Sequence, residues 1–166
     1  MILFLDFDGV LHPDQVYRVR GQPVLRAEGE LFMWAGILAD VLADQPHVRI
    51  VLSTSWVREL RFARARDYLL PELRSRVIGA TWHPGMKTDE EYRPLGRSTW
   101  WDRSARYEQV RRYVDRAQLQ HWVAVDDTSD GWGQSDLDKL VHTHRDRGLS
   151  DPEAVKRLTT LLGGKA

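Results

Sequence analysis

The chain has 166 residues, a length that suits one domain, and we expect residues 1–166 to form a single domain with a buried core. Its 24 lysine and arginine residues balance its 24 aspartate and glutamate residues, so the total charge provides no long-range attraction for nucleic acid or anionic membranes. The chain contains no cysteine, which excludes disulfides, thiolate metal sites and thiol nucleophiles.

The first segment is the apolar run Met1–Leu5, which Asp6 and Asp8 follow. Five consecutive apolar residues predict a strand of a parallel sheet that is buried on both faces. The run has no basic residue and Asp6 interrupts it, so we expect neither a signal peptide nor a membrane span, and we expect a cytoplasmic protein. Two carboxylates this close repel each other unless a cation relieves them, and their oxygens suit Mg²⁺.

Helices and strands are predicted to alternate along the rest of the chain. Residues 12–27 contain prolines and a glycine that predict a loop or short hairpin over the site. Apolar residues at intervals of three and four predict helices over 29–43, 57–70 and 106–117. Short apolar runs predict strands over 48–52, 77–80, 121–125 and 140–143. Segment 82–103 shows no clean periodicity and is interpreted as an excursion over one edge.

The last part of the chain is predicted to hold two further helices. Residues 134–140 favour a short helix, and a second helix begins at Ser150–Glu153 and ends at Gly163–Gly164. Ser150 is expected to be the N-cap of that helix, with Glu153 completing a capping box. Strands that alternate with helices predict an α/β fold, namely a three-layer Rossmann-like sandwich around a mainly parallel five-stranded sheet.

Polar side chains follow three of the predicted strands. They are Asp6 and Asp8, then Ser53, Thr54 and Ser55, and then Asp126 and Asp127. Parallel strands end at one edge of a sheet, so these side chains are expected to meet there. The combination resembles the haloacid dehalogenase (HAD) superfamily of phosphotransferases over nearly the whole chain. Residues 3–11 resemble its first motif and residues 123–127 its fourth. Segments 54–56, 140–143 and 148–150 resemble small HAD domains of bacterial RNA-repair proteins.

The resemblance implies a role for each acidic residue. Asp6 would be the nucleophile that forms an aspartyl-phosphate, and Asp8 would be the general acid and then the general base. Mg²⁺ would be held by Asp6, by the backbone carbonyl of Asp8 and by Asp126, with Asp127 acting directly or through water.

The resemblance also requires a hydroxyl and a fixed cation near the phosphoryl group. Either Ser53 or Thr54 would supply the hydroxyl, although both residue types are also common helix N-caps. Arg106, at the start of a predicted helix, is the preferred cation, and Arg103 and Lys87 are the alternatives.

These roles imply a Mg²⁺-dependent phosphomonoester hydrolase with a minimal cap. An open site suits a large phosphorylated substrate, and a nucleic-acid 3′-phosphate is the preferred one. A local basic face could come from Arg58, Arg61, Arg64, Arg66, Arg74 and Arg76. The alternatives are a non-catalytic module that binds phosphate or a partner on the same fold, and a phosphotransferase with an acceptor other than water. The sequence does not predict the oligomeric state.

A few other residues are weaker candidates. Trp82, Trp100 and Trp101 lie in the irregular segment and could stack on a base, although tryptophan is mostly a packing residue. His142 and His144 would share one face of a strand, but without a third ligand we interpret them as ordinary edge residues. His12 lies just past the site loop and could contact substrate, but it is interpreted as a turn residue before Pro13.

Overall fold

The centre of the molecule is a five-stranded sheet of order β5-β4-β1-β6-β7, and all of its neighbouring pairs are parallel. The computed structural model describes residues 1–88 and 100–163. The strands are β1 (Ile2–Leu5), β4 (Arg49–Leu52), β5 (Val77–Ala80), β6 (Trp122–Asp126) and β7 (Leu140–His142). The predicted α/β Rossmann-like fold with a parallel five-stranded sheet is therefore confirmed.

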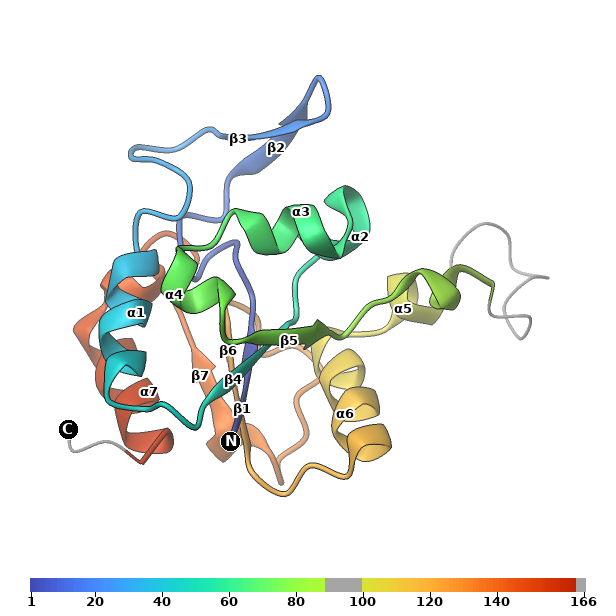
Figure 1. Ribbon diagram of the computed structural model, residues 1–166, viewed down its shortest axis with the longest axis vertical. Coiled ribbons are helices and arrows are strands. Elements are labelled where there is room, and N and C mark those ends of the chain that lie inside the picture. Colours follow the sequence, from blue (N-terminus) through green and yellow to red (C-terminus); the bar gives the residue numbers. More distant parts are fainter. Residues whose placement is uncertain (89–99, 164–166) are drawn as a thin grey trace.

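Both faces of the sheet are covered by helices, as Figure 1 shows. Leu3 and Leu5 of β1 pack with residues of α1 (Ala35–Ala43) and α7 (Pro152–Leu161). Phe4 points to the other face and packs with residues of α6 (Arg106–Ala117). Because successive side chains of a strand point to opposite faces, an unbroken apolar run is what a strand between two helical layers requires.

The predicted helix over 57–70 is wrong as a single element. The chain forms α2 (Trp56–Leu60), α3 (Phe62–Asp67) and the short α4 (Pro71–Arg74). Arg61 has a φ of 70° and a ψ of 155°, which no helix can continue through. The helix predicted from residue 29 likewise begins only at Ala35, after Phe32 adopts a φ of 62°.

The C-terminal elements also differ from the prediction. Of the helix predicted over 134–140, only the 3₁₀ turn η3 (Leu137–Lys139) forms. Ser150 belongs to η4 (Gly148–Ser150), and its hydroxyl donates to the carbonyl of Arg147. Asp151 is the N-cap of α7, because its carboxylate accepts from the backbone N–H of Glu153.

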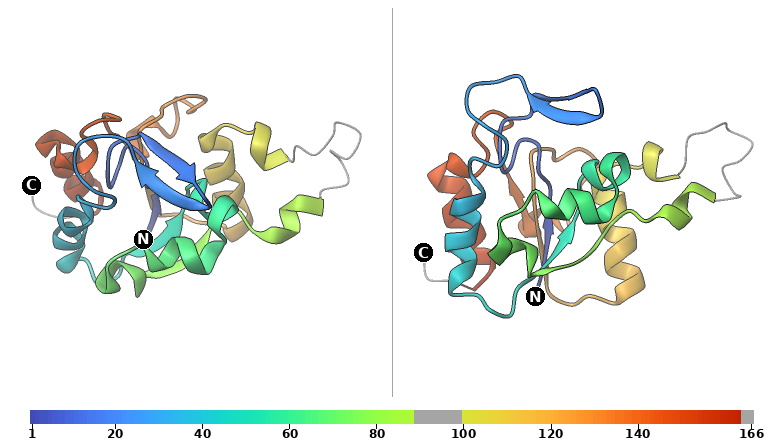
Figure 2. Two further views of the ribbon diagram at one scale, coloured as in Figure 1. Left: turned by 90° about the horizontal axis from the view of Figure 1, so that it is seen from above. Right: turned by 45° about the horizontal axis from the view of Figure 1, so that its top comes forward.

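Residues 12–27 contain the predicted hairpin, formed by β2 (Val16–Val19) and β3 (Gln22–Leu25). Its turn residues Arg20 and Gly21 both have positive φ, as a type I′ turn requires. Figure 2 shows the hairpin on the side of the sheet where the strands end. Polar contacts tie it to the helices below, because Arg18 pairs with Glu59 at 3.1 Å and Arg64 donates to the amide oxygen of Gln22 at 2.6 Å.

The irregular segment over 82–103 lies partly outside the described residues. Its described part contains η1 (Pro84–Thr88) and α5 (Trp100–Arg103). Trp82 and Trp101 are buried in the core, and the guanidinium of Arg112 lies over the ring of Trp100 at 4.4 Å. Trp82 and Trp101 therefore serve mainly as packing residues.

Arg76 and Arg74, two of the six arginines expected on one basic face, already have partners within the protein. Arg76 donates to the carbonyls of Leu42 and Gln45 at 2.8 and 2.7 Å, so it satisfies backbone groups at the end of α1. Arg74 lies 3.5 Å from the carboxylate of Asp67.

Within the described residues, no helix is long and apolar enough to cross a membrane.

Candidate active site

Three carboxylates meet where β1 and β6 end. Oxygen atoms of Asp6, Asp126 and Asp127 all lie within 4.8 Å of one another. The register explains this, because Leu5 pairs with Val125 and the next residue of each strand is an aspartate. The first and fourth sequence motifs, 120 residues apart in the chain, are thus brought together at the predicted edge of the sheet.

Arg106 bridges the two buried carboxylates. Its Nη2 donates to Oδ2 of Asp6 at 3.1 Å, and its Nε lies 3.2 Å from Oδ2 of Asp126 without the alignment of a hydrogen bond. The other oxygen of each carboxylate accepts from the backbone, from Phe7 N–H at 2.7 Å and from Thr128 N–H at 3.0 Å. The guanidinium of Arg106 thus contacts both buried carboxylates, and its role as the fixed cation stays a prediction.

One arginine does not balance this much negative charge. Burial raises the pKa of Asp6 well above its usual range, and the neighbouring carboxylates of Asp126 and Asp8 raise it further, while Arg106 lowers it. Burial also raises the pKa of Asp126 to about 6, against the opposing effect of Arg106. The pKa of Asp127 is raised by burial and by the charge of Asp14. An all-oxygen cluster whose negative charge exceeds the single positive charge beside it fits a hard divalent cation such as Mg²⁺.

These shifts predict how stability depends on pH when no divalent cation is present. A carboxyl whose folded-state pKa is raised binds its proton more tightly in the folded state, so stability is lost as pH rises. For Asp126, a shift from 3.8 to about 6 corresponds to about 3 kcal/mol. We therefore expect the melting temperature in EDTA to fall between about pH 4 and about pH 7, and excess Mg²⁺ to oppose the fall.

Thermal unfolding by circular dichroism measures this effect. Asp126→Asn should flatten the dependence of the melting temperature on pH in EDTA, which separates Asp126 from the six histidines. A melting temperature that rises with pH in EDTA for the parent protein would contradict the prediction.

The two candidate hydroxyls after β4 have different surroundings. Thr54 Oγ1 accepts from Trp56 N–H at 3.4 Å, a contact of the kind that caps a helix start. Ser53 Oγ is buried and has no hydrogen-bond partner among the residues that the structure describes. Because buried hydroxyls normally have partners, the unpaired Oγ makes Ser53 the stronger candidate of the two for the hydroxyl role.

Gly9 lets the loop after β1 pass directly beside Asp127. It has a φ of 67°, and a Cβ built on it would lie 2.6 Å from side-chain atoms of Asp127. The hydroxyl of Thr143, just after β7, donates to the carbonyl of Gly9 at 2.8 Å. The loop is therefore held from both sides, and only glycine fits at this position.

Two residues that sequence reasoning missed hold Asp8. Trp56 Nε1 lies 3.1 and 3.0 Å from its two carboxylate oxygens, and His12 Nε2 lies 3.1 Å from Oδ1. His12 is fully buried, so it is not the simple turn residue that was expected. Its spacing of four residues from Asp8 was the available signal, whereas nothing local indicates the contact with Trp56.

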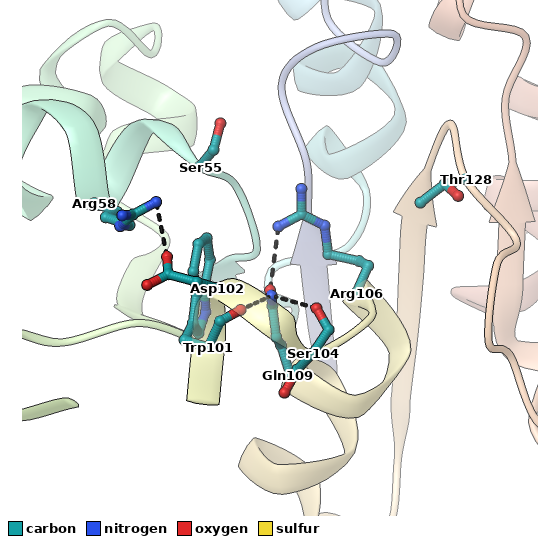
Figure 3. Close-up of a pocket in the computed structure, with 8 residues that line it drawn as sticks. All are labelled: Ser55, Arg58, Trp101, Asp102, Ser104, Arg106, Gln109 and Thr128. Atoms are coloured by element: carbon teal, nitrogen blue, oxygen red, sulfur yellow. Dashed lines mark hydrogen bonds and ion pairs between the residues drawn. The ribbon is translucent and has the colours of Figure 1, made fainter. Parts of the chain in front are cut away.

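A cavity of about 590 Å³, drawn in Figure 3, reaches the carboxylates through Arg106, which lines it and contacts Asp6. Arg106 and Arg58 both line it, with Ser55, Trp101, Asp102, Ser104, Gln109 and Thr128. Arg58 pairs with Asp102 at 2.8 Å, and Gln109 donates to the carbonyls of Trp101 and Ser104. The cavity gives an anionic ligand access to two guanidinium groups.

The remaining candidates whose side chains the structure describes lie outside the cluster. Arg103 is exposed on α5, and the side chain of Lys87 lies outside the described part of the chain. His142 Nε2 contacts the carbonyl of Asp127 at 3.0 Å, and His144 Nδ1 accepts from the backbone N–H of Asp146. Neither histidine belongs to the carboxylate cluster found among the described residues.

Comparison with known proteins gives one match. The model of a family described as the HAD domain in Swiss Army Knife RNA repair proteins matches residues 2–154. The search of curated proteins and the search of solved structures gave no match. The matched region holds every acidic residue of the site, the whole five-stranded sheet and all of its helices except most of α7. The match supports a phosphohydrolase function of the general HAD kind. The chain therefore belongs to the family of HAD domains found in Swiss Army Knife RNA repair proteins.

Proposed function

We propose that this protein is a Mg²⁺-dependent phosphomonoester hydrolase that acts through an aspartyl-phosphate on Asp6. The observation that carries the proposal is the contact of Asp6 with Arg106 inside a cluster of three carboxylates. Asp6, Asp126 and Asp127, with the backbone carbonyl of Asp8, would hold the ion. When bound, Mg²⁺ neutralises phosphate oxygens and so favours attack by a carboxylate.

The residues of the chain divide the reaction between them. An oxygen of Asp6 attacks phosphorus as the bond to the leaving oxygen breaks, and Asp8 gives its proton to that oxygen. Water then attacks phosphorus, Asp8 takes its proton, and the bond to Asp6 breaks to release inorganic phosphate. Arg106 and the hydroxyl of Ser53 bind the phosphoryl oxygens throughout.

We further propose a nucleic-acid 3′-phosphate as the substrate, in a cytoplasmic setting. The family description names RNA repair proteins, which supports this choice. Among the described residues, the β2–β3 hairpin lies on the side of the sheet where the strands end, and Arg58 and Arg106 line the cavity next to the carboxylates. A small cover suits a phosphate at the end of a long chain.

Hydrolysis assays test both parts of the proposal. The protein should release phosphate from p-nitrophenyl phosphate with Mg²⁺ and lose that activity in EDTA. Among oligonucleotides, those with a 3′-phosphate should give a higher kcat/KM than those with a 5′-phosphate and than sugar phosphates. No turnover on any of these with Mg²⁺ would refute the hydrolase, and a preference for another class would refute only the substrate.

A further inference from the structure

The carboxyl group of Asp8 is fixed from its buried side by two donors. The indole N–H of Trp56 contacts both carboxylate oxygens, at 3.1 and 3.0 Å, and His12 Nε2 lies 3.1 Å from Oδ1. His12 Nδ1 accepts from Phe32 N–H at 3.2 Å, so in the neutral imidazole the hydrogen is on Nε2 and is donated to Asp8. Both contacts therefore run from a ring N–H to the carboxylate.

Packing locks both donors in place. Trp56 has 4% of its surface exposed and His12 has none. The Trp56 ring meets Phe7, Phe32 and Tyr68 edge to face, with centroids 5.1 to 5.6 Å apart. The ring of His12 packs against those of Phe32 and Trp56, with centroids 4.9 and 5.7 Å away. These rings leave the two N–H groups little freedom to turn away from Asp8.

The free side of Asp8 opens into a small cavity. Its side chain is 23% exposed, and it lines a space of about 170 Å³ between the hairpin and α2. Tyr17, Pro23 and Leu60 line the same space. A proton donor has to lie within hydrogen-bond reach of the oxygen it protonates, and an aspartate that rotates freely meets that condition only part of the time.

We propose that Trp56 and His12 are positioning residues that orient the carboxyl group of Asp8 toward the leaving-group oxygen of the substrate. The proposal rests on the proposed hydrolase function. The positioning role explains why two ring N–H groups contact Asp8 from a cluster of rings that is otherwise packed by apolar contacts. Neither residue touches the reacting atoms, so each acts only through Asp8.

Dependence on the leaving group tests the proposal. Expulsion of an alkoxide needs a proton, whereas p-nitrophenolate leaves readily without one. Trp56→Phe keeps an aromatic ring but removes the N–H. We expect it to lower kcat/KM for glycerol 2-phosphate about 100-fold and for p-nitrophenyl phosphate less than about threefold. Because kcat/KM covers only the steps up to formation of the aspartyl-phosphate, later action of Asp8 on water does not affect the comparison.

Three further variants serve as controls. Trp132→Phe removes the N–H of another buried tryptophan and should leave both values unchanged. Asp8→Asn should show the same preference for the better leaving group, and adding Trp56→Phe to it should have no further effect. His12→Asn, whose side-chain oxygen can still accept from Phe32, provides a second test if Trp56→Phe fails to fold, as circular dichroism will show.

The outcomes separate this proposal from the function on which it rests. Equal losses on both substrates in a folded Trp56→Phe variant, or no loss on either, overturn the positioning role and leave the hydrolase intact. An inactive parent protein overturns both. If Trp56→Phe still lowers kcat/KM for glycerol 2-phosphate when Asp8 is already asparagine, Trp56 acts by a route other than Asp8. That result also overturns the proposal.

Discussion

Replacing Asp6 with asparagine is expected to abolish phosphomonoester hydrolysis, with kcat/KM lower by at least about 10⁴-fold. An amide has nearly the shape of a carboxylate but cannot attack phosphorus to form the acyl phosphate. The same change removes a buried negative charge whose pKa is raised by burial and by neighbouring carboxylates. We therefore expect folding to survive, and the metal-free variant to melt at or above the temperature of the parent near neutral pH.

Phosphate release from p-nitrophenyl phosphate, together with thermal unfolding, measures both effects. Asp40→Asn is the matched control, because Asp40 is exposed on α1 and the change alters no part of the site. Activity that persists in purified Asp6→Asn at more than about 1% of the parent rate would show that another group is the nucleophile, or that the preparation contains another phosphatase.

The sequence predicted best where one physical requirement dominates a segment. A strand between two helical layers has to be apolar on both faces, so β1 and β6 were visible as unbroken apolar runs. The aspartates that follow them lie together because parallel neighbours end at the same edge, as the register of Leu5 with Val125 shows. The resemblance to HAD proteins favoured Arg106, at the predicted start of α6, and in the structure its guanidinium donates to the carboxylate of Asp6.

The failures have physical causes of another kind. The break between α2 and α3 comes from a positive φ at Arg61, which nothing about arginine indicates. Ser150 and Asp151 are both good N-cap residues, so the residue type alone does not identify the first residue of α7. The contact of Trp56 with Asp8 joins residues 48 apart in the chain, and local patterns carry no information about such pairs.

The charge of Arg106 is expected to have opposite effects on catalysis and on metal binding. In Arg106→Met the phosphoryl group loses a fixed positive charge, so kcat/KM for p-nitrophenyl phosphate should fall by about 10²- to 10³-fold. The same variant leaves Asp6 and Asp126 without the cation that contacts both of them. A more negative cluster attracts a dication more strongly, so Mg²⁺ should bind at least about tenfold more tightly.

Titration calorimetry with Mg²⁺ and the hydrolysis assay measure the two effects on the same protein. Arg116→Met is the control, because Arg116 lies at the far end of α6 with its guanidinium over Tyr113, and neither value should change. An unfolded variant would lose both hydrolysis activity and Mg²⁺ binding. A variant that loses activity but binds Mg²⁺ more tightly shows that Arg106 acts through its charge. If the activity of Arg106→Met stays within about threefold of the parent, Arg103 or Lys87 would instead be the cation that binds the phosphoryl group.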